Sequence, residues 1–241
     1  MSKQTDLINV TDAITVSGSN VGIGTSSPDL SGFGSGTNGL DISDATLAGL
    51  RLNGNAADSL YLVSGADRHW VLGRGAVPMT FSTNGTERMR IDATGAVTMP
   101  HQPAFLVTKN LDQNNIATGS EVTVTWQAEV FDQNSDFASN VFTAPVTGKY
   151  LLTSAIRVDN LDTASNYYNF LFTTSNRIYR KIIDYGGISG DPVYWFFSLT
   201  AIADMDAGDT ASVKIYQDNG TAQMDIRGDV TRSYFSGYLV A

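Results

Sequence analysis

Polar and apolar residues alternate along most of the chain, so that apolar positions recur at spacing two. In the first hundred residues the alternating segments are short, and turn-forming pairs such as Asn53-Gly54 and Asn84-Gly85 interrupt them repeatedly. Spacing two is the period of a β-strand, and no segment shows the helical period convincingly. Frequent short strands separated by turns predict an all-β protein.

From residue 104 onwards the alternation is stronger and richer in aromatic residues, and it predicts ten strands. One of them, 193–203, is apolar on both phases over Val193–Leu199. Strands with this pattern are buried on both faces, so we expect one face in the core of a sandwich and the other against a neighbouring subunit. The predicted strands are 104–109, 122–126, 128–131, 141–144, 148–158, 167–174, 177–184, 193–203, 209–217 and 233–240.

Composition changes near residue 100. Residues 1–100 hold 14 of the 23 glycines but only four of the aromatic residues, and Pro100 and Pro103 flank the change. Proline fixes the backbone and interrupts strand pairing, so the sequence predicts a domain boundary here. We expect three parts, namely an N-terminal segment 1–13, a glycine-rich part 14–100 and a C-terminal domain 101–241.

The glycine-rich part contains a weakly repeated hairpin. Residues 14–16 and 21–23 form one candidate, and residues 89–91 and 97–99 form the other, each with a turn between its strands. Such small units bury too little apolar surface to offset the entropy that ordering costs. Wrapping of three chains around a common axis solves this problem, so we expect an intertwined, trimeric shaft that resembles a β-prism.

Two phrases in this part resemble segments that recur in bacteriophage tail fibres. Residues 19–28 read SNVGIGTSSP and residues 87–95 read ERMRIDATG, within matching regions 14–28 and 80–99. The same phrases occur in some bacterial surface proteins. The resemblance implies a virion fibre, with residues 1–13 docking onto other virion proteins.

The C-terminal domain resembles the C1q/TNF-like family. The resemblance is carried by Phe131, Phe137, the FTAP of residues 142–145, the GKYLL of 148–152 and the closing SYFSGYLV of 233–240. It implies a ten-stranded jelly-roll sandwich that forms a homotrimer.

Two positions depart from the family pattern, and five aromatic residues are predicted to lie in the core. Asn134 does not fall at the usual Asn/Asp spacing, and Leu151-Leu152 stands where an aromatic residue is usual. Aromatic side chains on the inward phase of strands are usually buried. The predicted core residues are Phe131, Phe142, Tyr150, Phe235 and Tyr238.

Charge and composition exclude several partners. The formal net charge is −9 and cysteine is absent. An acidic chain lacks the clustered Lys and Arg that nucleic-acid binding needs. No apolar run approaches the ~20 residues that span a bilayer, and no signal peptide is recognised at the N-terminus. We therefore expect a virion protein made in the host cytoplasm, with no nucleic-acid partner and no membrane insertion.

Candidate chemistry is sparse, and the sequence predicts no enzyme and no obligatory cofactor. No catalytic constellation of His, Ser or paired carboxylates is recognised. Asp204, Asp206 and Asp209 lie in one oxygen-rich turn that is compatible with calcium, although a solvated turn with side-chain-to-backbone bonds is the favoured interpretation.

Strand alternation places four loops at the tip of the domain, away from the chain termini. These loops are 110–121, 159–166, 185–192 and 218–232. Their Tyr, Asn and Asp side chains suit a sugar or a protein surface, through stacking and paired hydrogen bonds. The predicted receptor-binding residues are Asn160, Asp162, Asn166, Tyr185, Asp191, Asn219 and Arg227.

The sequence therefore predicts a trimeric phage fibre whose C-terminal domain binds a host-surface glycan or protein. Several weak sites on one axis would act together. The first alternative is a decoration fibre of the capsid or collar without a specific receptor. A polysaccharide depolymerase is the second, and the absence of a long parallel β-helix and of paired carboxylates argues against it.

Overall fold

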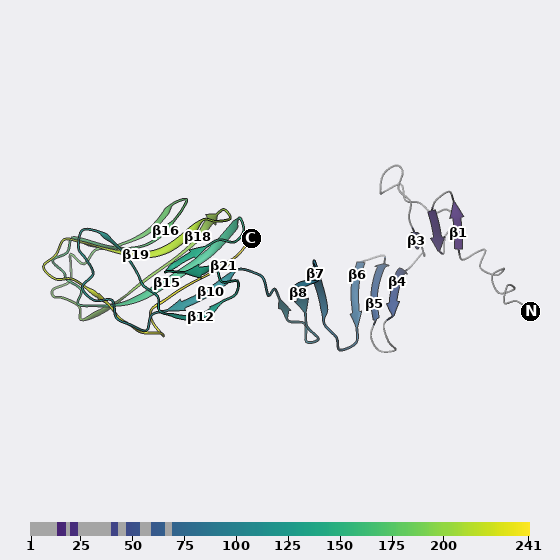
Figure 1. Cartoon of the computed structure of the whole chain (residues 1–241), viewed down its shortest axis with the longest axis horizontal. Helices are drawn as coiled ribbons and strands as arrows, with labels where there is room; N and C mark the ends of the chain where they lie inside the picture. The colour runs from purple at the N-terminus through teal and green to yellow at the C-terminus, as the bar shows by residue number, and fades with distance from the viewer. Residues whose placement is uncertain (1–13, 18–19, 24–39, 43–46, 54–58, 66–68) are drawn as a thin grey trace, which may run out of the picture. The chain divides into compact units, whose positions relative to one another are not determined.

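The computed structural model describes residues 14–17, 20–23, 40–42, 47–53, 59–65 and 69–241. All regular elements in these ranges are strands, and the expected all-β class is confirmed. No helix in the described part of the chain is long and apolar enough to cross a membrane. The chain divides into two compact units, residues 1–99 and 100–241 (Figure 1), whereas the predicted boundary lay between residues 100 and 101. The predicted attachment segment 1–13 lies outside the described residues.

The described residues of the N-terminal unit form three sheets of three strands each. Both predicted hairpins are confirmed, because Ile14 lies opposite Ile23 and Ile91 lies opposite Val97 in antiparallel pairs. The strands are β1 (Ile14–Ser17), β2 (Asn20–Ile23) and β3 (Leu40–Ile42); β4 (Leu47–Asn53), β5 (Ser59–Gly65) and β6 (His69–Arg74); and β7 (Met79–Thr83), β8 (Thr86–Ile91) and β9 (Val97–Thr98).

Large apolar side chains of this unit remain exposed. Val71, Phe81 and Val97 are each about half exposed, at 58%, 49% and 54%. Three-stranded sheets with one uncovered apolar face gain little stability by themselves. The exposure agrees with the argument that these hairpins need other chains, while the trimeric shaft itself stays a prediction.

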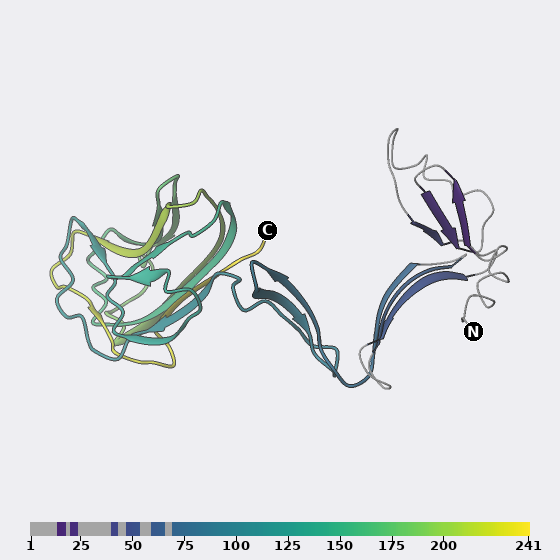
Figure 2. The ribbon, with the colours of Figure 1, turned by 45° about the vertical axis from the view of Figure 1, so that its right-hand side comes forward.

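The C-terminal unit is a sandwich of two antiparallel sheets (Figures 1 and 2). We call the sheet in the order β12-β10-β21-β15-β18 the front sheet and the sheet in the order β13-β14-β19-β16-β17 the back sheet. The first and last strands of this unit, β10 and β21, lie side by side, and in each sheet strands from distant parts of the chain pair, such as β15 with β21 and β14 with β19. This crossed connectivity is that of a jelly roll.

The predicted strands agree closely with the observed ones. Two short additional strands, β13 (Phe137–Ala138) and β20 (Asp225–Ile226), were not predicted, because a pair of residues carries no periodicity. The other strands are β10 (Ala104–Thr108), β11 (Glu121–Thr123), β12 (Ala128–Asp132), β14 (Val141–Thr143), β15 (Gly148–Asp159), β16 (Tyr167–Thr174), β17 (Ile178–Ile183), β18 (Tyr194–Met205), β19 (Thr210–Asp218) and β21 (Tyr234–Leu239).

The core lies between the two sheets and is rich in stacked aromatic rings. Phe105 packs on Phe142 with ring centroids 4.7 Å apart, and Phe172 packs on Phe235 at 5.7 Å. Offset or edge-on ring contacts of this kind stabilise a core beyond the area they bury. The predicted core positions Phe142, Tyr150 and Phe235 are confirmed, because each is at most 1% exposed.

The prediction of a core position is wrong for two residues. Phe131 is 46% exposed and Tyr238 is 49% exposed. Tyr238 is three residues after the buried Phe235, so it points to the opposite face of β21. Phe131 pairs with Leu106 at the edge strand β12, on the outward phase. Both side chains therefore lie on the outer face of the front sheet.

Candidate functional site

Four loops converge at one end of the C-terminal domain, which we call the loop end. They are 109–120, 160–166, 184–193 and 219–233. Hydrogen bonds join them to one another: Asn160 Nδ2 donates to Asp225 Oδ2 over 2.8 Å, and Thr163 Oγ1 donates to Asp191 over 2.6 Å. The chain leaves at the opposite end, where the amide of Lys149 donates to the carbonyl of Ala241.

Two of the predicted receptor-binding residues are buried, so their side chains are not exposed at the surface as expected. Asp162 is 2% exposed and Tyr185 is 5% exposed. Tyr185 packs edge-on against Tyr168 and Trp195, and none of the described residues forms a hydrogen bond with its hydroxyl. Burial raises the pKa of Tyr185. Polar side chains in a loop are commonly exposed, but these two turn inward and support the loops from beneath.

Asp162 organises two loops through its carboxylate. It accepts hydrogen bonds from the amides of Ala164 and Ala222, over 2.8 and 2.7 Å, and from the amide and hydroxyl of Thr221. Burial by itself would raise the pKa of Asp162, but these hydrogen bonds together outweigh it and lower that pKa. The ionised carboxylate therefore holds loop 219–233 against loop 160–166.

The five other predicted residues lie at the loop end with their side chains or carbonyls already engaged. Asn166 Nδ2 donates to Asp218 over 2.9 Å, and Asp191 accepts from both the amide and the hydroxyl of Thr163. Asn219 has a φ of 60°, and its carbonyl accepts from Ser165 and Gln217. Arg227 forms ion pairs with Asp112 and Asp159. Asn160, bonded to Asp225 as described above, is the fifth of these engaged residues.

These bonds tie the loops to one another and fix the shape of the loop end. A role for any of the five residues in receptor contact stays a prediction.

The calcium candidates lie at the opposite end of the domain. Asp204 forms an ion pair with Arg177 at 2.5 Å, and Asp209 Oδ2 accepts from Asn176 and from the amide of Asp206. Within the described ranges, no three acidic or histidine side chains gather into a group that could hold a metal ion. Calcium binding at Asp204, Asp206 and Asp209 stays a prediction, and these side chains do not form a cluster of metal ligands in the described structure.

The loop end also carries an open groove that the sequence analysis did not identify as a site. Its volume is about 940 Å³. Three consecutive aromatic residues form its apolar surface: Tyr194, Trp195 and Phe196 are 65%, 44% and 48% exposed. We call this feature the aromatic groove, and its lining residues are Arg157, Tyr194, Trp195, Phe196 and Arg232.

The aromatic groove follows from the position of β18 at the edge of the front sheet. Phe197 is buried in the core, so Phe196 takes the outward phase, where it lies opposite Arg157 of β15. Trp195 stands on the ring of Tyr185, with centroids 5.5 Å apart. The sequence signal for this groove is the run Val193–Leu199, which is apolar on both phases. From the sequence alone, that run is interpreted as a contact between subunits and not as a binding site.

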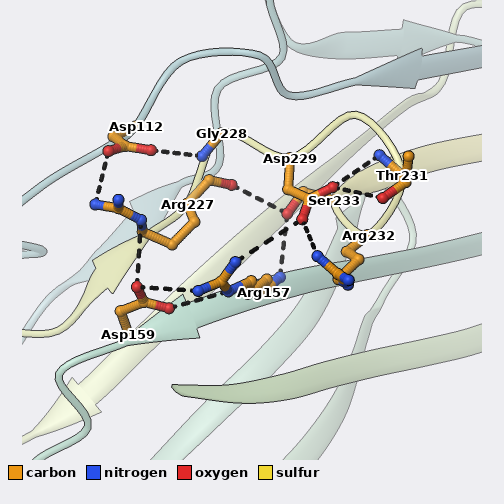
Figure 3. A network of polar contacts seen from close by, with 9 residues as sticks. All are labelled: Asp112, Arg157, Asp159, Arg227, Gly228, Asp229, Thr231, Arg232 and Ser233. Carbon is orange, nitrogen blue, oxygen red and sulfur yellow. Dashed lines mark hydrogen bonds and ion pairs between the residues drawn. The ribbon is translucent and has the colours of Figure 1, made fainter. Parts of the chain in front are cut away.

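A network of arginine and aspartate side chains borders the groove (Figure 3). Arg157 contacts Asp159 at 3.2 Å and Asp229 at 3.9 Å, and its guanidinium lies over the ring of Tyr194 at 5.6 Å. Arg232 contacts Asp229 at 2.6 Å. Hydrogen bonds from Thr231 and then from Arg232 outweigh the opposing effect of burial and lower the pKa of Asp229 to about 2. The carboxylate is thus ionised at neutral pH and holds both arginines in place.

The groove therefore offers exposed aromatic faces beside charged hydrogen-bond donors. Aromatic side chains provide rigid contact area at low entropic cost. Guanidinium groups provide donors in a planar fork that suits carboxylates and other oxygen-rich groups. The arrangement is suited to binding.

No protein-family model and no curated protein matches the chain. Among solved structures, the globular domain of zebrafish complement 1qA protein is similar to 58% of this chain over 98% of that structure, at 19% identity and a TM-score of 0.42. A crystal structure of murine APRIL at pH 8.0 is similar to 58% of this chain over 99% of its own, at 14% identity and a TM-score of 0.43. The strand order of the C-terminal domain is what identifies it as a jelly-roll sandwich.

Proposed function

We propose that this chain is a subunit of a homotrimeric phage fibre, and that its C-terminal domain binds a receptor on the host surface. The aromatic groove carries this proposal, because three large aromatic side chains remain exposed at the loop end, opposite the end of the domain that holds the C-terminus. Clusters of exposed apolar side chains often mark sites of interaction with a ligand or another protein. Binding without chemistry is sufficient for this role.

An apolar patch on the front sheet supports self-association. Ile202, Tyr238 and Phe131 are 57%, 49% and 46% exposed. Leu151 lies between Tyr238 and Ile202 in the sheet, and Leu106 lies beside Phe131, so the five side chains share the outer face. Contiguous apolar surface of this kind is usually covered by another protein surface. We assign it to a neighbouring copy of this chain, and we call it the front-sheet patch.

Trimerisation would place three aromatic grooves on one particle. A receptor contact that is weak in one subunit then becomes strong, because the second and third contacts form at high effective concentration. The exposed apolar residues of the N-terminal unit fit the same assembly, and residues 1–13 would attach the fibre to other virion proteins. In this proposal the N-terminal unit projects the receptor-binding domains.

Replacing Trp195 and Phe196 together by alanine is expected to reduce binding of the purified full chain to host cells at least about tenfold, because both residues line the aromatic groove and aromatic anchors often contribute about 2 kcal/mol or more. Bound protein is measured by flow cytometry with a fluorescent label. The matched control replaces Val146 and Ile178, which are 45% and 44% exposed, and it should bind normally.

The same samples distinguish the alternative functions. A receptor-binding fibre competes with infection, whereas a decoration fibre neither binds cells nor competes. Release of reducing ends from host polysaccharide would identify a depolymerase and contradict the proposal.

Replacing Ile202 by aspartate is expected to weaken the trimer, because the front-sheet patch would then bury an unpaired charge. Sedimentation of the full chain should show a trimer for the original sequence and a dissociation midpoint shifted at least about tenfold for the variant. Ile182→Asp, at a position 67% exposed on the back sheet, is the control and should sediment like the original chain. A monomeric original chain in dilute buffer contradicts the assembly.

A further inference from the structure

The charged lining of the aromatic groove is one-sided. Arg157 and Arg232 line it, and no carboxylate of the residues that the structure describes does. The side chain of Arg232 is 60% exposed and that of Arg157 is 32% exposed, whereas those of their partners Asp159 and Asp229 are 16% and 15% exposed. The guanidinium groups are thus more exposed than the carboxylates with which they pair, and Figure 3 shows these pairs.

Arg232 has unused donors. Its Nη1 donates to Asp229, while no described residue receives a hydrogen bond from its Nε or Nη2. Arg157 directs Nε and Nη2 toward Asp159, at 3.2 and 3.5 Å, so it is more fully engaged. Asp229 also fixes the backbone beneath Arg232, because its carbonyl accepts from the amides of Arg232 and Ser233. Arg232 is therefore held in position with part of its fork available to a ligand.

The charge around the groove is more favourable for binding an anion than the net charge of the whole chain is. The chain carries a net charge of −9. At the groove, Arg157, Arg227 and Arg232 balance Asp112, Asp159 and Asp229, and the network is neutral. Charges elsewhere on the surface are largely screened beyond about 8 Å at physiological salt. A carboxylate that enters the groove contacts the exposed guanidinium donors of Arg232 and Arg157 before the less exposed carboxylates of Asp159 and Asp229.

We propose that the aromatic groove binds a carboxylated saccharide, such as a uronic or a nonulosonic acid unit of a surface glycan. The carboxylate pairs with Arg232, and the apolar face of the sugar ring packs on Phe196, which lies on the outward face of β18. Charge-assisted bonds from a guanidinium to a carboxylate are about twice as strong as neutral ones. This inference rests on the proposed receptor-binding function and specifies its ligand class.

The test compares acidic oligosaccharides with their own methyl esters on an immobilised panel that includes galacturonate oligomers and sialyllactose. The probe is the full chain. At least one acid is expected to bind about tenfold or more tightly than its ester, with affinity that falls as salt rises. Arg232→Gln should abolish the preference, and Arg232→Lys should retain part of it. Arg177→Gln removes a similarly exposed arginine, 55% exposed, at the opposite end and should have no effect.

Equal binding of acid and ester throughout the panel overturns the inference, as does an acid preference that survives Arg232→Gln. Because Arg232 is largely exposed, an unchanged melting temperature is expected and confirms that the variant folds. If cell binding still depends on Trp195 and Phe196 when no acid is preferred, the ligand class fails and the proposed function stands. If the chain binds no host cells, the function itself fails.

Discussion

Asp162→Ala is expected to lower the free energy of unfolding of the C-terminal domain by about 3 kcal/mol or more. The carboxylate accepts from three backbone amides, of Ala164, Thr221 and Ala222. A hydrogen bond to a charged group contributes about 1.5–3 kcal/mol, so the loss of several such bonds to one buried carboxylate accounts for this figure. Urea unfolding followed by tryptophan fluorescence measures the change, which is large compared with a typical stability of about 5–15 kcal/mol.

Asp191→Ala is the matched control, because Asp191 also accepts an amide and a hydroxyl, both from Thr163, but at an exposed position. We expect a change below about 1 kcal/mol there. The hydrogen bonds of Asp162 also give a pH dependence: its pKa is lowered in the folded chain, so its contribution is present above pH 4 and is lost as the pH falls below that value. Equal destabilisation by the two variants would contradict the role assigned to Asp162.

Raising the pH from about 8 to about 10 is expected to stabilise the domain by about 2 kcal/mol, through Lys109. This side chain is fully buried, and its Nζ donates to the carbonyl and hydroxyl of Thr125, both at 3.0 Å, without a carboxylate in contact. Burial lowers the pKa of Lys109 to about 8, although Asp112 opposes the shift. Between this value and the ordinary 10.5 the unfolded chain binds more protons than the folded one, so stability rises with pH.

Thermal unfolding at pH 7.5, 9 and 10 measures this effect. Lys109→Met should abolish the rise, and it should be more stable than the original chain at pH 7.5, because it removes a buried charge. Lys214→Met is the control and should keep the rise, since Lys214 is 26% exposed and paired with Glu121. Measurements stop near pH 10. Burial raises the pKa of Tyr150 and Tyr168 in the folded chain, so above that pH these tyrosines lower the free energy of unfolding and would mask the effect of Lys109. Parallel curves for the original chain and Lys109→Met would refute the prediction.

Strand positions were well predicted, because alternation with period two is a local property. Residues 167–174 were predicted as a strand, and β16 spans Tyr167–Thr174. The inward or outward direction of each side chain was less predictable. Phe235 and Tyr238 lie in one strand, and both are aromatic, but only Phe235 faces the core. Hydrophobicity alone does not separate them.

At the candidate site, too, the sequence predicted where the loops lie better than it predicted the direction of their side chains. The polar loop residues were expected to face a receptor, but Asp162 points inward to three amides, and Tyr185 lies beneath Trp195. No feature of the loop sequence distinguishes an aspartate that caps a loop from one that faces solvent. The aromatic groove also joins residues of β15, β18 and loop 219–233, which are far apart along the chain.

The amino-acid sequence by itself determined the all-β class, the two hairpins and most strand boundaries, because each depends on alternation and turns within a few neighbouring residues. Only the tertiary structure decided which face of each strand is covered and which loops meet. Those features depend on the order of strands across two sheets, as where β18 pairs with β15 and brings Phe196 opposite Arg157. A period of two shows that residues share a face of a strand, but the packing of the sheets decides whether that face meets the core or the solvent.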